Sequence, residues 1–336
     1  MNQLPITQRY SSRDGSMKFL VTGGAGFIGH NVVRELEQQG HEVGVLDNFT
    51  NYGIIPEAEL TPLHQERLDS IATTSIHNVD IRNYQGVLSV FEECMPDIII
   101  HLAAYPRAKA VDLNPVEGSQ VLTTGVINLL RASSAVKARR FVYVSSSMVY
   151  GDFEHMAYED MQCNPRGIYG ILKLAGENLT RDACKRDGID YVVVRPSAVY
   201  GPRDVLDRVV SRFLYSAIHN ETLTVCGGQE RLDFTYIDDV VNGIVRASTG
   251  FNSSKRIYNI TRGQSRTLLE AAEIAISIAG GGVIKIADAN PRFPSRGTLS
   301  NIRAGQDFGY RGTVNIEEGF KKYYEWLISK NTILWD

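Results

Sequence analysis

The stretch Val21-Thr22-Gly23-Gly24-Ala25-Gly26-Phe27-Ile28-Gly29 decides the fold of the first half of this 336-residue chain. It joins an apolar, strand-like run to an amphipathic segment of helical length. Glycines at this spacing let the backbone turn tightly and approach a pyrophosphate, and the free N–H groups of the following helix attract phosphate oxygens. A glycine-rich turn alone is equally compatible with an ordinary strand-to-helix connection. The residues that we predict to contact a dinucleotide here are Gly23, Gly26, Phe27, Ile28 and Gly29.

The end of the second apolar run strengthens the dinucleotide interpretation. It reads Val45-Leu46-Asp47-Asn48, and an acidic residue roughly 20 positions beyond the glycines is where the adenosine ribose hydroxyls are held. Asp47 would repel a 2′-phosphate and no arginine follows directly, so the sequence favours NAD over NADP. We expect Asp47 and Asn48 to bind the cofactor. Asp80 and Ile81 end the third run and are expected to flank the adenine, with an ordinary strand-end turn as the alternative.

Strand-like and helix-length segments alternate through the first 195 residues, which predicts β-α-β units and a doubly wound parallel sheet. The predicted fold class is α/β, a Rossmann-type sheet with a smaller C-terminal α/β substrate-binding lobe. The expected strands are Lys18–Thr22, Val43–Leu46, Ile76–Val79, Ile98–Leu102, Phe141–Val144 and Tyr191–Val194. The expected helices are Phe27–Gln39, Tyr84–Glu93, Pro115–Ser134 and Gly167–Arg186. The predicted organisation is a flexible tail over 1–16, an NAD-binding domain over 17–195, and mainly the substrate lobe over 196–336, with segments returning to the first domain.

Composition excludes several classes of protein. A formal charge of -3 gives no field that would recruit nucleic acid. The four cysteines are far apart, which indicates reduced thiols in a cytoplasmic protein rather than a zinc site or a disulfide framework. No apolar run approaches the roughly 18 to 20 residues needed to cross a bilayer, so we expect no membrane partner. The seven histidines form no metal-ligand pattern, and we expect no metal.

A possible catalytic pair lies in the last predicted helix of this domain. Tyr169 and Lys173 are four residues apart, so both side chains lie on one helix face. A phenol with a pKa of about 10 is a weak base at neutral pH, but a nearby ammonium favours the phenolate. Taken alone, this pair is more typical of a solvated helix face. A Ser-rich turn, Ser145-Ser146-Ser147, follows a strand just before this helix. It favours the catalytic interpretation, because a hydroxyl there can bind the oxygen that Tyr169 deprotonates.

Together these residues resemble the extended short-chain dehydrogenase/reductase superfamily, in its NAD-dependent sugar-nucleotide epimerase/dehydratase branch, and in particular enzymes like UDP-glucose 4-epimerase. The resemblance covers roughly Lys18 to Trp326. It is carried by TGGAGFIG from Thr22, LDN from Leu46, HLAA from His101, SSSMVYG from Ser145, YGILK from Tyr169, RPSAVYGPR from Arg195, LDFTYIDD from Leu232 and RGTLS from Arg296.

The resemblance implies a role for each member of a Ser146, Tyr169, Lys173 triad. The tyrosine acts as acid and base, the lysine binds the nicotinamide ribose and polarises the tyrosine, and Ser146 bonds the sugar. It also implies that Leu102, Ala103 and Ala104 contact NAD, that the substrate is a nucleoside diphosphate sugar, and that two copies form a homodimer through Pro115–Ser134 and Gly167–Arg186.

The chain departs from the family's 4,6-dehydratases directly after Ser146. Those enzymes carry Asp and Glu at the next two positions, where this chain has Ser147 and Met148, and the related decarboxylases usually carry Glu at the Met148 position. Without these carboxylates, elimination lacks an obvious acid and base. The sequence therefore favours an epimerase that oxidises C4 to a ketone and re-reduces it on the other face. A net sugar-nucleotide reductase or dehydrogenase is the main alternative, with a 4,6-dehydratase or a cofactor-sensing binding protein less favoured.

The substrate side matches the family less well. Ala198 and Leu232 stand where relatives often have Asn and Arg for the diphosphate, and Leu122 replaces an Asn near the active site. Arginine forks suit diphosphates. We therefore predict substrate contacts from Ser146, Ser147, Tyr169, Arg203, Arg231 and Arg296, of which Arg296 is the preferred diphosphate ligand and a surface arginine is the alternative. His101, at the end of a strand, is expected to be packed rather than catalytic.

Overall fold

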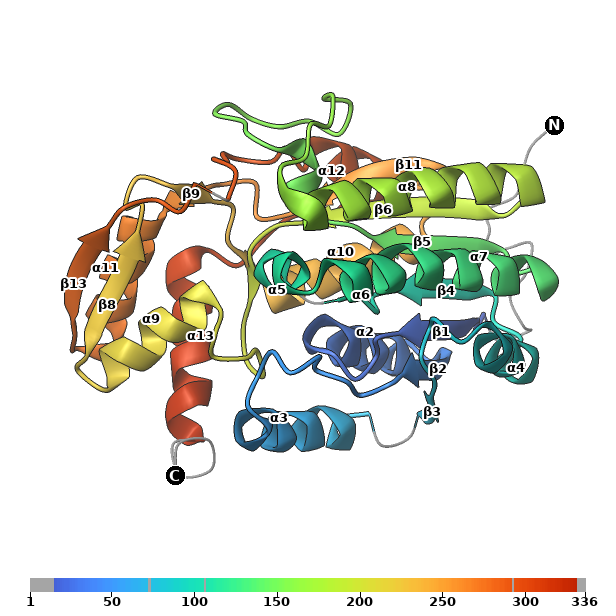
Figure 1. Ribbon diagram of the computed structural model, residues 1–336, viewed down its shortest axis with the longest axis horizontal. Coiled ribbons are helices and arrows are strands. Elements are labelled where there is room, and N and C mark those ends of the chain that lie inside the picture. Colours follow the sequence, from blue (N-terminus) through green and yellow to red (C-terminus); the bar gives the residue numbers. More distant parts are fainter. Residues whose placement is uncertain (1–14, 72–73, 106, 292, 331–336) are drawn as a thin grey trace.

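Seven parallel strands form the central sheet of the computed structural model, in the order β11-β6-β5-β4-β1-β2-β3 (Figure 1). The structure describes residues 15–71, 74–105, 107–291 and 293–330. The order reverses between β1 and β4, so the loops that follow these two strands separate and leave a crevice at the carboxyl edge of the sheet. The strands are β1 (Lys18–Thr22), β2 (Glu42–Asp47), β3 (Ser75–Asn78), β4 (Ile98–His101), β5 (Arg140–Val144), β6 (Asp190–Pro196) and β11 (Arg256–Ile260).

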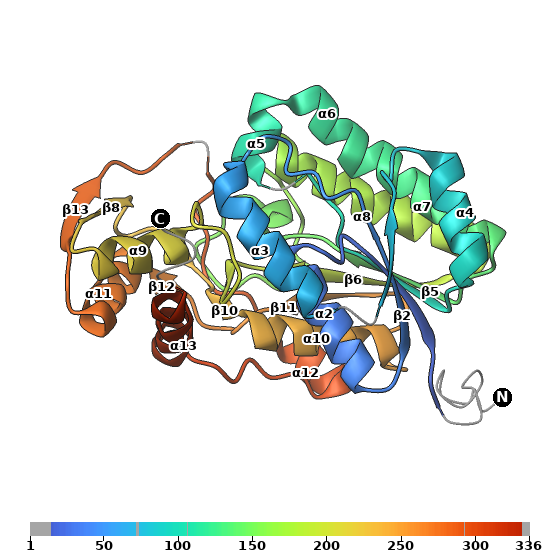
Figure 2. The ribbon, with the colours of Figure 1, turned by 90° about the horizontal axis from the view of Figure 1, so that it is seen from below.

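Helices cover both faces of this sheet (Figure 2). One layer consists of α2 (Phe27–Gln38), α10 (Ile237–Thr249) and α12 (Ile302–Phe308). The other consists of α4 (Tyr84–Cys94), α5 (Ala108–Leu113), α6 (Pro115–Ser119), α7 (Gly125–Ala135) and α8 (Gly167–Asp187), with a π-helical turn over Gln120–Thr124 between α6 and α7. Alternate residues of each strand enter opposite cores: Val21 packs on the first layer and Leu20 on the second. Buried parallel strands need apolar residues on both faces for this reason.

A smaller lobe lies beyond the carboxyl edge of the sheet (Figure 1). It holds the parallel pair β8 (Thr222–Cys226) and β13 (Val283–Ala287), packed with α9 (Val209–Ile218), α11 (Leu268–Ala279) and α13 (Ile316–Ser329). A capping box between Thr267 and Glu270 starts α11. Two further short pairs connect the lobe: β7 (Val199–Tyr200) with β10 (Thr235–Tyr236), and β9 (Arg231–Leu232) with β12 (Arg266–Thr267).

The predicted fold class is confirmed, and each of the six expected strands exists within two residues of its expected ends. The sequence interpretation missed β11 as the seventh strand and α3 (Glu57–Asp69), which follows β2. The expected helix over Pro115–Ser134 is present as α6, the π-helical turn and α7. Of the second half of the chain, β11 pairs with β6 in the central sheet, and α10 and α12 belong to the first helix layer. Of the tail predicted over 1–16, residues 1–14 lie outside the described residues.

Close packing between α8 and β5 sets the position of the predicted catalytic helix. Gly176 of α8 lies directly over Tyr143 of β5, and a Cβ there would collide with the Tyr143 hydroxyl group. That hydroxyl donates to the carbonyl oxygen of Lys173 at 3.4 Å, one turn earlier in the helix. The absence of a side chain at 176 therefore lets α8 lie close to the strand that ends at the Ser-rich turn.

We expect Gly176→Ala to lower the free energy of unfolding by about 1–2 kcal/mol, because overpacking against the buried Tyr143 outweighs the gain in helix propensity. Urea unfolding followed by circular dichroism measures this change. Asn178→Ala, on the exposed side of the same helix, is the control and should change stability by no more than about 0.5 kcal/mol. Unchanged or increased stability of Gly176→Ala would contradict the packing argument.

Candidate active site

The glycine turn lies where β1 and β4 diverge, and it has no room for side chains. Gly23 has a φ of 72°, and a Cβ there would lie 2.6 Å from the backbone nitrogen of Ala103. A Cβ on Gly29 would collide with the carbonyl oxygen of Gly23. Gly26 precedes α2, and no side chain of the described residues caps that helix. The first N–H groups of α2 are therefore free to bind an anion.

Asp47 ends β2 with its carboxylate held by backbone N–H groups on both sides. Ala25 N donates to Oδ2 at 3.0 Å and Phe49 N donates to Oδ1 at 2.9 Å. Burial raises the pKa of Asp47, and these hydrogen bonds oppose that rise. The side chain is thus fixed beside the glycine turn, where it can accept hydrogen bonds from a ribose.

Asp80 is placed differently from the sequence expectation. Burial raises its pKa, but hydrogen bonds from Arg82 outweigh burial and hold the pKa below its usual value. Arg82 Nη2 donates to Asp80 Oδ2 at 2.7 Å, and Asn48 Nδ2 donates to the same oxygen at 3.0 Å. Asp80 therefore positions Asn48, whereas the neighbouring Ile81 faces the cavity.

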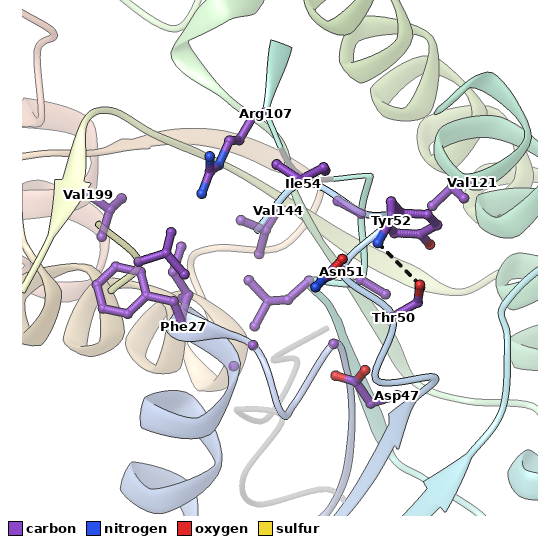
Figure 3. Close-up of a pocket in the computed structure, with 18 of the residues that line it drawn as sticks. Phe27, Asp47, Thr50, Asn51, Tyr52, Ile54, Arg107, Val121, Val144 and Val199 are labelled. Carbon is purple, nitrogen blue, oxygen red and sulfur yellow. Dashed lines mark hydrogen bonds between the residues drawn. The ribbon is translucent and has the colours of Figure 1, made fainter. Parts of the chain in front are cut away.

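A cavity of about 370 Å³ follows the carboxyl edge of the sheet (Figure 3). Its lining includes these groups and the predicted triad. Fourteen of the predicted site residues line it: Gly23, Gly26, Phe27, Ile28, Gly29, Asp47, Asn48, Ile81, Leu102, Ala103, Ala104, Ser146, Tyr169 and Lys173. The predicted residues that do not line it are Asp80, Ser147, Arg203, Arg231 and Arg296.

The three triad residues meet at one end of the cavity. Ser146 precedes a 3-10 turn over Ser147–Tyr150 and accepts a hydrogen bond from Met148 N at 3.2 Å. Burial raises the pKa of the Tyr169 phenol, and the charge of Arg208 and the bond to Ser146 oppose this rise. Lys173 Nζ lies 5.9 Å from the centre of the Tyr169 ring and donates to the Val144 carbonyl at 2.9 Å.

Lys173 is almost fully buried. Burial lowers the pKa of its ammonium group from 10.5 to about 8, and the charge of Glu177 opposes that shift. The group is therefore mostly protonated at neutral pH, close to the point at which it titrates. A cation so placed lowers the energy of a phenolate at Tyr169.

The predicted substrate arginines are scattered. Arg296 reaches the catalytic turn, with Nη1 at 3.5 Å from Ser147 Oγ, and burial lowers its pKa to about 10. Arg231 bonds Ser265 in the β9–β12 pair. Arg203 forms an ion pair with Glu66 of α3 at 3.0 Å. The contacts of these three residues with a substrate stay predictions.

His101 is packed, as expected. It is buried, its Nδ1 lies 2.7 Å from Thr22 Oγ1, and burial lowers its pKa to about 3. Among the described residues, no group of three or more His, Cys, Asp or Glu side chains could hold a metal ion. Within the same ranges, no helix is long and apolar enough to cross a membrane.

The sequence interpretation missed one whole side of the cavity. His64 and Arg67 come from α3, Arg107 from the loop after β4, and Asp204 and Arg208 from the loop before α9. Arg107 points into the cavity (Figure 3) and pairs with Asp207. Leu60, Leu63 and Arg67 lie on the buried side of α3, but Pro62 and the weak apolar periodicity of this helix left little signal in the sequence. Arg107 and Arg208 carried no such signal, because they meet only through tertiary structure.

A nucleotide-sized cavity at the switch point, a glycine turn and a Ser-Tyr-Lys triad define a short-chain dehydrogenase/reductase enzyme. Residues 19–261 match the model of the NAD dependent epimerase/dehydratase family. The chain belongs to this family, whose cofactor is NAD.

Relatives of known name cover most of the chain. UDP-glucose 4-epimerase of Mycolicibacterium smegmatis is 30% identical over 324 residues, which span 94% of this chain and all of that protein. UDP-glucuronic acid decarboxylase 1 of Xenopus tropicalis is 30% identical over 332 residues, or 94% of this chain and 75% of that protein. The structure of UDP-glucuronic acid 4-epimerase from Bacillus cereus, in complex with UDP-glucuronic acid and NAD, superposes with a TM-score of 0.85 at 28% identity, over 93% of this chain and 99% of that one.

We expect Asp47→Asn to weaken NADH binding about 10- to 100-fold, because hydrogen bonds to a charged acceptor contribute roughly 1.5–3 kcal/mol. The preference for NADH over NADPH should shrink as the charge that repels a 2′-phosphate is lost. Fluorescence titration of nucleotide-free protein measures both affinities. Asp69→Asn, at an exposed position of α3, is the control, and equal affinity of Asp47→Asn and wild type would refute the assignment.

Proposed function

We propose that this protein is an NAD-dependent epimerase of a nucleoside diphosphate sugar, which inverts C4 through a transient 4-keto sugar. The observation that carries this proposal is the Ser146, Tyr169, Lys173 triad at the end of the cavity, followed by two positions without carboxylates. Relatives named as 4-epimerases, of UDP-glucose and of UDP-glucuronate, support the reaction class.

The residues around the cavity fit NAD. Gly23, Gly26 and Gly29 leave room for a pyrophosphate against the start of α2, and Asp47 with Asn48 offers acceptors for the adenosine ribose. Ile81 with Leu102, Ala103 and Ala104 supplies apolar walls. When bound, NAD supplies a hydride acceptor and donor, which the side chains of a protein cannot provide.

The triad handles the proton. Tyr169 removes the proton from the 4-hydroxyl of the sugar as C4 is oxidised, and it returns the proton when C4 is reduced on the other face. Ser146 bonds the same oxygen and holds it beside Tyr169. Lys173 stabilises the phenolate and bonds the nicotinamide ribose. General acid–base catalysis of this kind contributes roughly 10²–10⁴-fold.

The two positions after Ser146 argue against elimination or decarboxylation. The Ser147 hydroxyl and the Met148 thioether do not titrate near neutral pH, so neither can replace the carboxyl groups that those reactions use as acid and base. We therefore propose that the keto sugar is reduced rather than eliminated or decarboxylated.

The diphosphate of the substrate is assigned to Arg296. Its Nε is buried and makes no hydrogen bond within the described residues, although the side chain lies beside Ser147. A buried guanidinium with unused donors is suited to a bidentate phosphate contact. Ser147 completes this contact, while Arg203 and Arg231 are weaker candidates because other residues of the chain already bind them.

We also propose a cytoplasmic homodimer that packs through α7 and α8. Ile127 of α7 and Ile171 of α8 are 41% and 53% exposed, and Ile168 lies beside them at the start of α8. Burying such side chains against a second copy removes apolar surface from water.

A panel of UDP-, GDP-, CDP- and dTDP-sugars tests the reaction. Formation of the C4 isomer without net NADH change supports an epimerase. Stoichiometric NADH change would indicate the reductase or dehydrogenase, which uses the same triad. A 4-keto-6-deoxy product or released CO₂ would instead assign the dehydratase or the decarboxylase found among the relatives.

Tyr169→Phe should lower kcat for epimerisation by about 10²–10⁴-fold with little change in substrate affinity, because it removes the proton acceptor and leaves the cavity intact. Tyr310→Phe, which removes a buried hydroxyl bonded to the Thr261 carbonyl outside the cavity, should retain activity. Rates within threefold for Tyr169→Phe and wild type would exclude Tyr169 as the base.

The pH profile of kcat should have a basic limb near pH 8. Lys173 is charged below its pKa of about 8 and neutral above it, so the stabilisation of the Tyr169 phenolate is lost as pH rises through that value. Initial rates between pH 6 and 10 at constant ionic strength measure the limb. A profile that stays level to about pH 9.5 would show that the charge on Lys173 does not matter for the reaction.

A further inference from the structure

Glu177 is a buried carboxylate one helical turn after Lys173, and the proposed chemistry does not use it directly. The side chains of Glu177 and Arg195 are 1% and 2% exposed. Arg195 of β6 donates to both carboxylate oxygens, through Nη2 at 2.6 Å and Nε at 2.9 Å. Buried ion pairs are weak sources of stability, because removing two charges from water costs about as much as the pair returns. The Glu177–Arg195 pair is therefore expected to have a role other than stabilising the fold.

Two consecutive residues of β5 and its turn join this pair to the triad. The Val144 carbonyl accepts from Lys173 Nζ at 2.9 Å, and the Ser145 hydroxyl donates to Glu177 Oε1 at 2.6 Å. The next residue is Ser146. Lys173 and Glu177 thus hold the backbone and the side chain that directly precede the catalytic serine.

Besides Glu177, two aromatic rings favour a cation at Lys173, whose Nζ lies 5.4 Å from the centre of the Tyr143 ring and 5.9 Å from that of Tyr169. From β4, His101 is buried, and its lowered pKa leaves it neutral at physiological pH. From β5 and α8, Tyr143 and Tyr169 present neutral phenols, whose pKa values burial raises. The guanidinium of Arg195 binds the Glu177 carboxylate, and it also contacts the Glu159 carbonyl and the Tyr150 ring. Arg208 is the further cation, and it faces Tyr169.

We propose that Glu177 is a positioning residue for catalysis: it keeps Lys173 protonated inside the protein and, with Arg195, fixes the turn that presents Ser146. The inference rests on the proposed function for its effect on rate, but the charge state of Lys173 can be measured without any substrate. Glu177 touches neither the cavity nor the reacting atoms. Its effect passes through Lys173 and Ser145.

Glu177→Gln removes the charge with little change in shape, and Glu177→Asp keeps the charge on a shorter side chain. Asp190→Asn is the matched control. Asp190 accepts from the buried Arg140 Nε at 2.7 Å at the opposite end of β6, so this variant also leaves a buried arginine without its anion. General loosening of the sheet would affect the control and the test variant alike.

The titration of Lys173 is the primary readout. Carbon-13 labelling of lysine side chains gives a Cε resonance for each residue, and its loss in Lys173→Met assigns the one required. We expect Glu177→Gln to lower the titration midpoint of Lys173 by roughly one pH unit or more, and to move the basic limb of kcat down equally. Glu177→Asp and Asp190→Asn should keep both near their wild-type values.

The outcomes separate this inference from the proposed function. A lowered Lys173 midpoint in a protein that epimerises no sugar would support the positioning role and refute the reaction. An unchanged midpoint in an active Glu177→Gln enzyme would overturn the positioning role alone, as would an equal shift in Asp190→Asn. If Glu177→Gln does not fold, Glu177→Gln combined with Arg195→Met removes both buried charges and should still lower the midpoint. In the wild-type protein a Lys173 that titrates below pH 7 would overturn the inference without any Glu177 variant.

Discussion

The close approach of two backbone segments, the glycine turn after β1 and the loop after β4, is the constraint on which the rest of the site depends. Gly23 lies so near Ala103 that a methyl group would not fit, so the backbones after β1 and β4 touch where the two strands diverge. This contact fixes the distance between the start of α2 and the apolar wall formed by residues 102–104. A crevice at the switch point of a doubly wound sheet follows from topology, but its width here is set by two backbone segments.

Buried cationic side chains have two different roles in this molecule. Arg140 is fully buried, and it donates to the carbonyl oxygens of Ala247, Ser248 and Gly250 at the end of α10. It bonds carbonyl groups at a helix end, which have no partner within the helix. Lys173, by contrast, makes one backbone hydrogen bond and retains donors that face the cavity. Arg140 uses its donors within the fold, whereas Lys173 keeps donors at the cavity, where a ligand can accept hydrogen bonds from them.

The fold and many of the residues that line the cavity were predictable because they belong to short, local sequence patterns. The turn from Gly23 to Gly29, the acidic end of β2 and the four-residue spacing of Tyr169 and Lys173 each depend on neighbours in sequence. The features that the sequence interpretation missed depend on contacts between residues that are far apart in the chain. Helix α3 contains Pro62 and has weak apolar periodicity, so its pattern was poor, although Leu60 and Leu63 are buried.

Side-chain direction was the least predictable property. Arg203 was expected near the substrate, yet Glu66 of α3, a helix that the sequence interpretation lacked, binds it. The backbone carbonyl of Arg203 in turn accepts from Arg67 Nε and Nη2. Asp80 likewise accepts directly from Asn48, and it is held by Arg82, a residue two positions later that the motif did not include.

The reaction at such a site depends on which acids and bases are absent as well as on which are present. Tyr169, Ser146 and Lys173 suffice to move one proton and to favour an oxyanion, and this requirement is common to epimerases, dehydratases and reductases. Further steps need further acids and bases near the 4-keto sugar. Asp47 is held by backbone N–H groups beside the glycine turn, and Asp204, also on the cavity wall, is buried next to Arg208. Ser147 and Met148 fill the positions nearest to Ser146 with groups that do not titrate. In the proposed reaction, a keto sugar formed beside Tyr169 would meet no carboxylate at positions 147 and 148, and return of the proton from Tyr169 is the course that we propose.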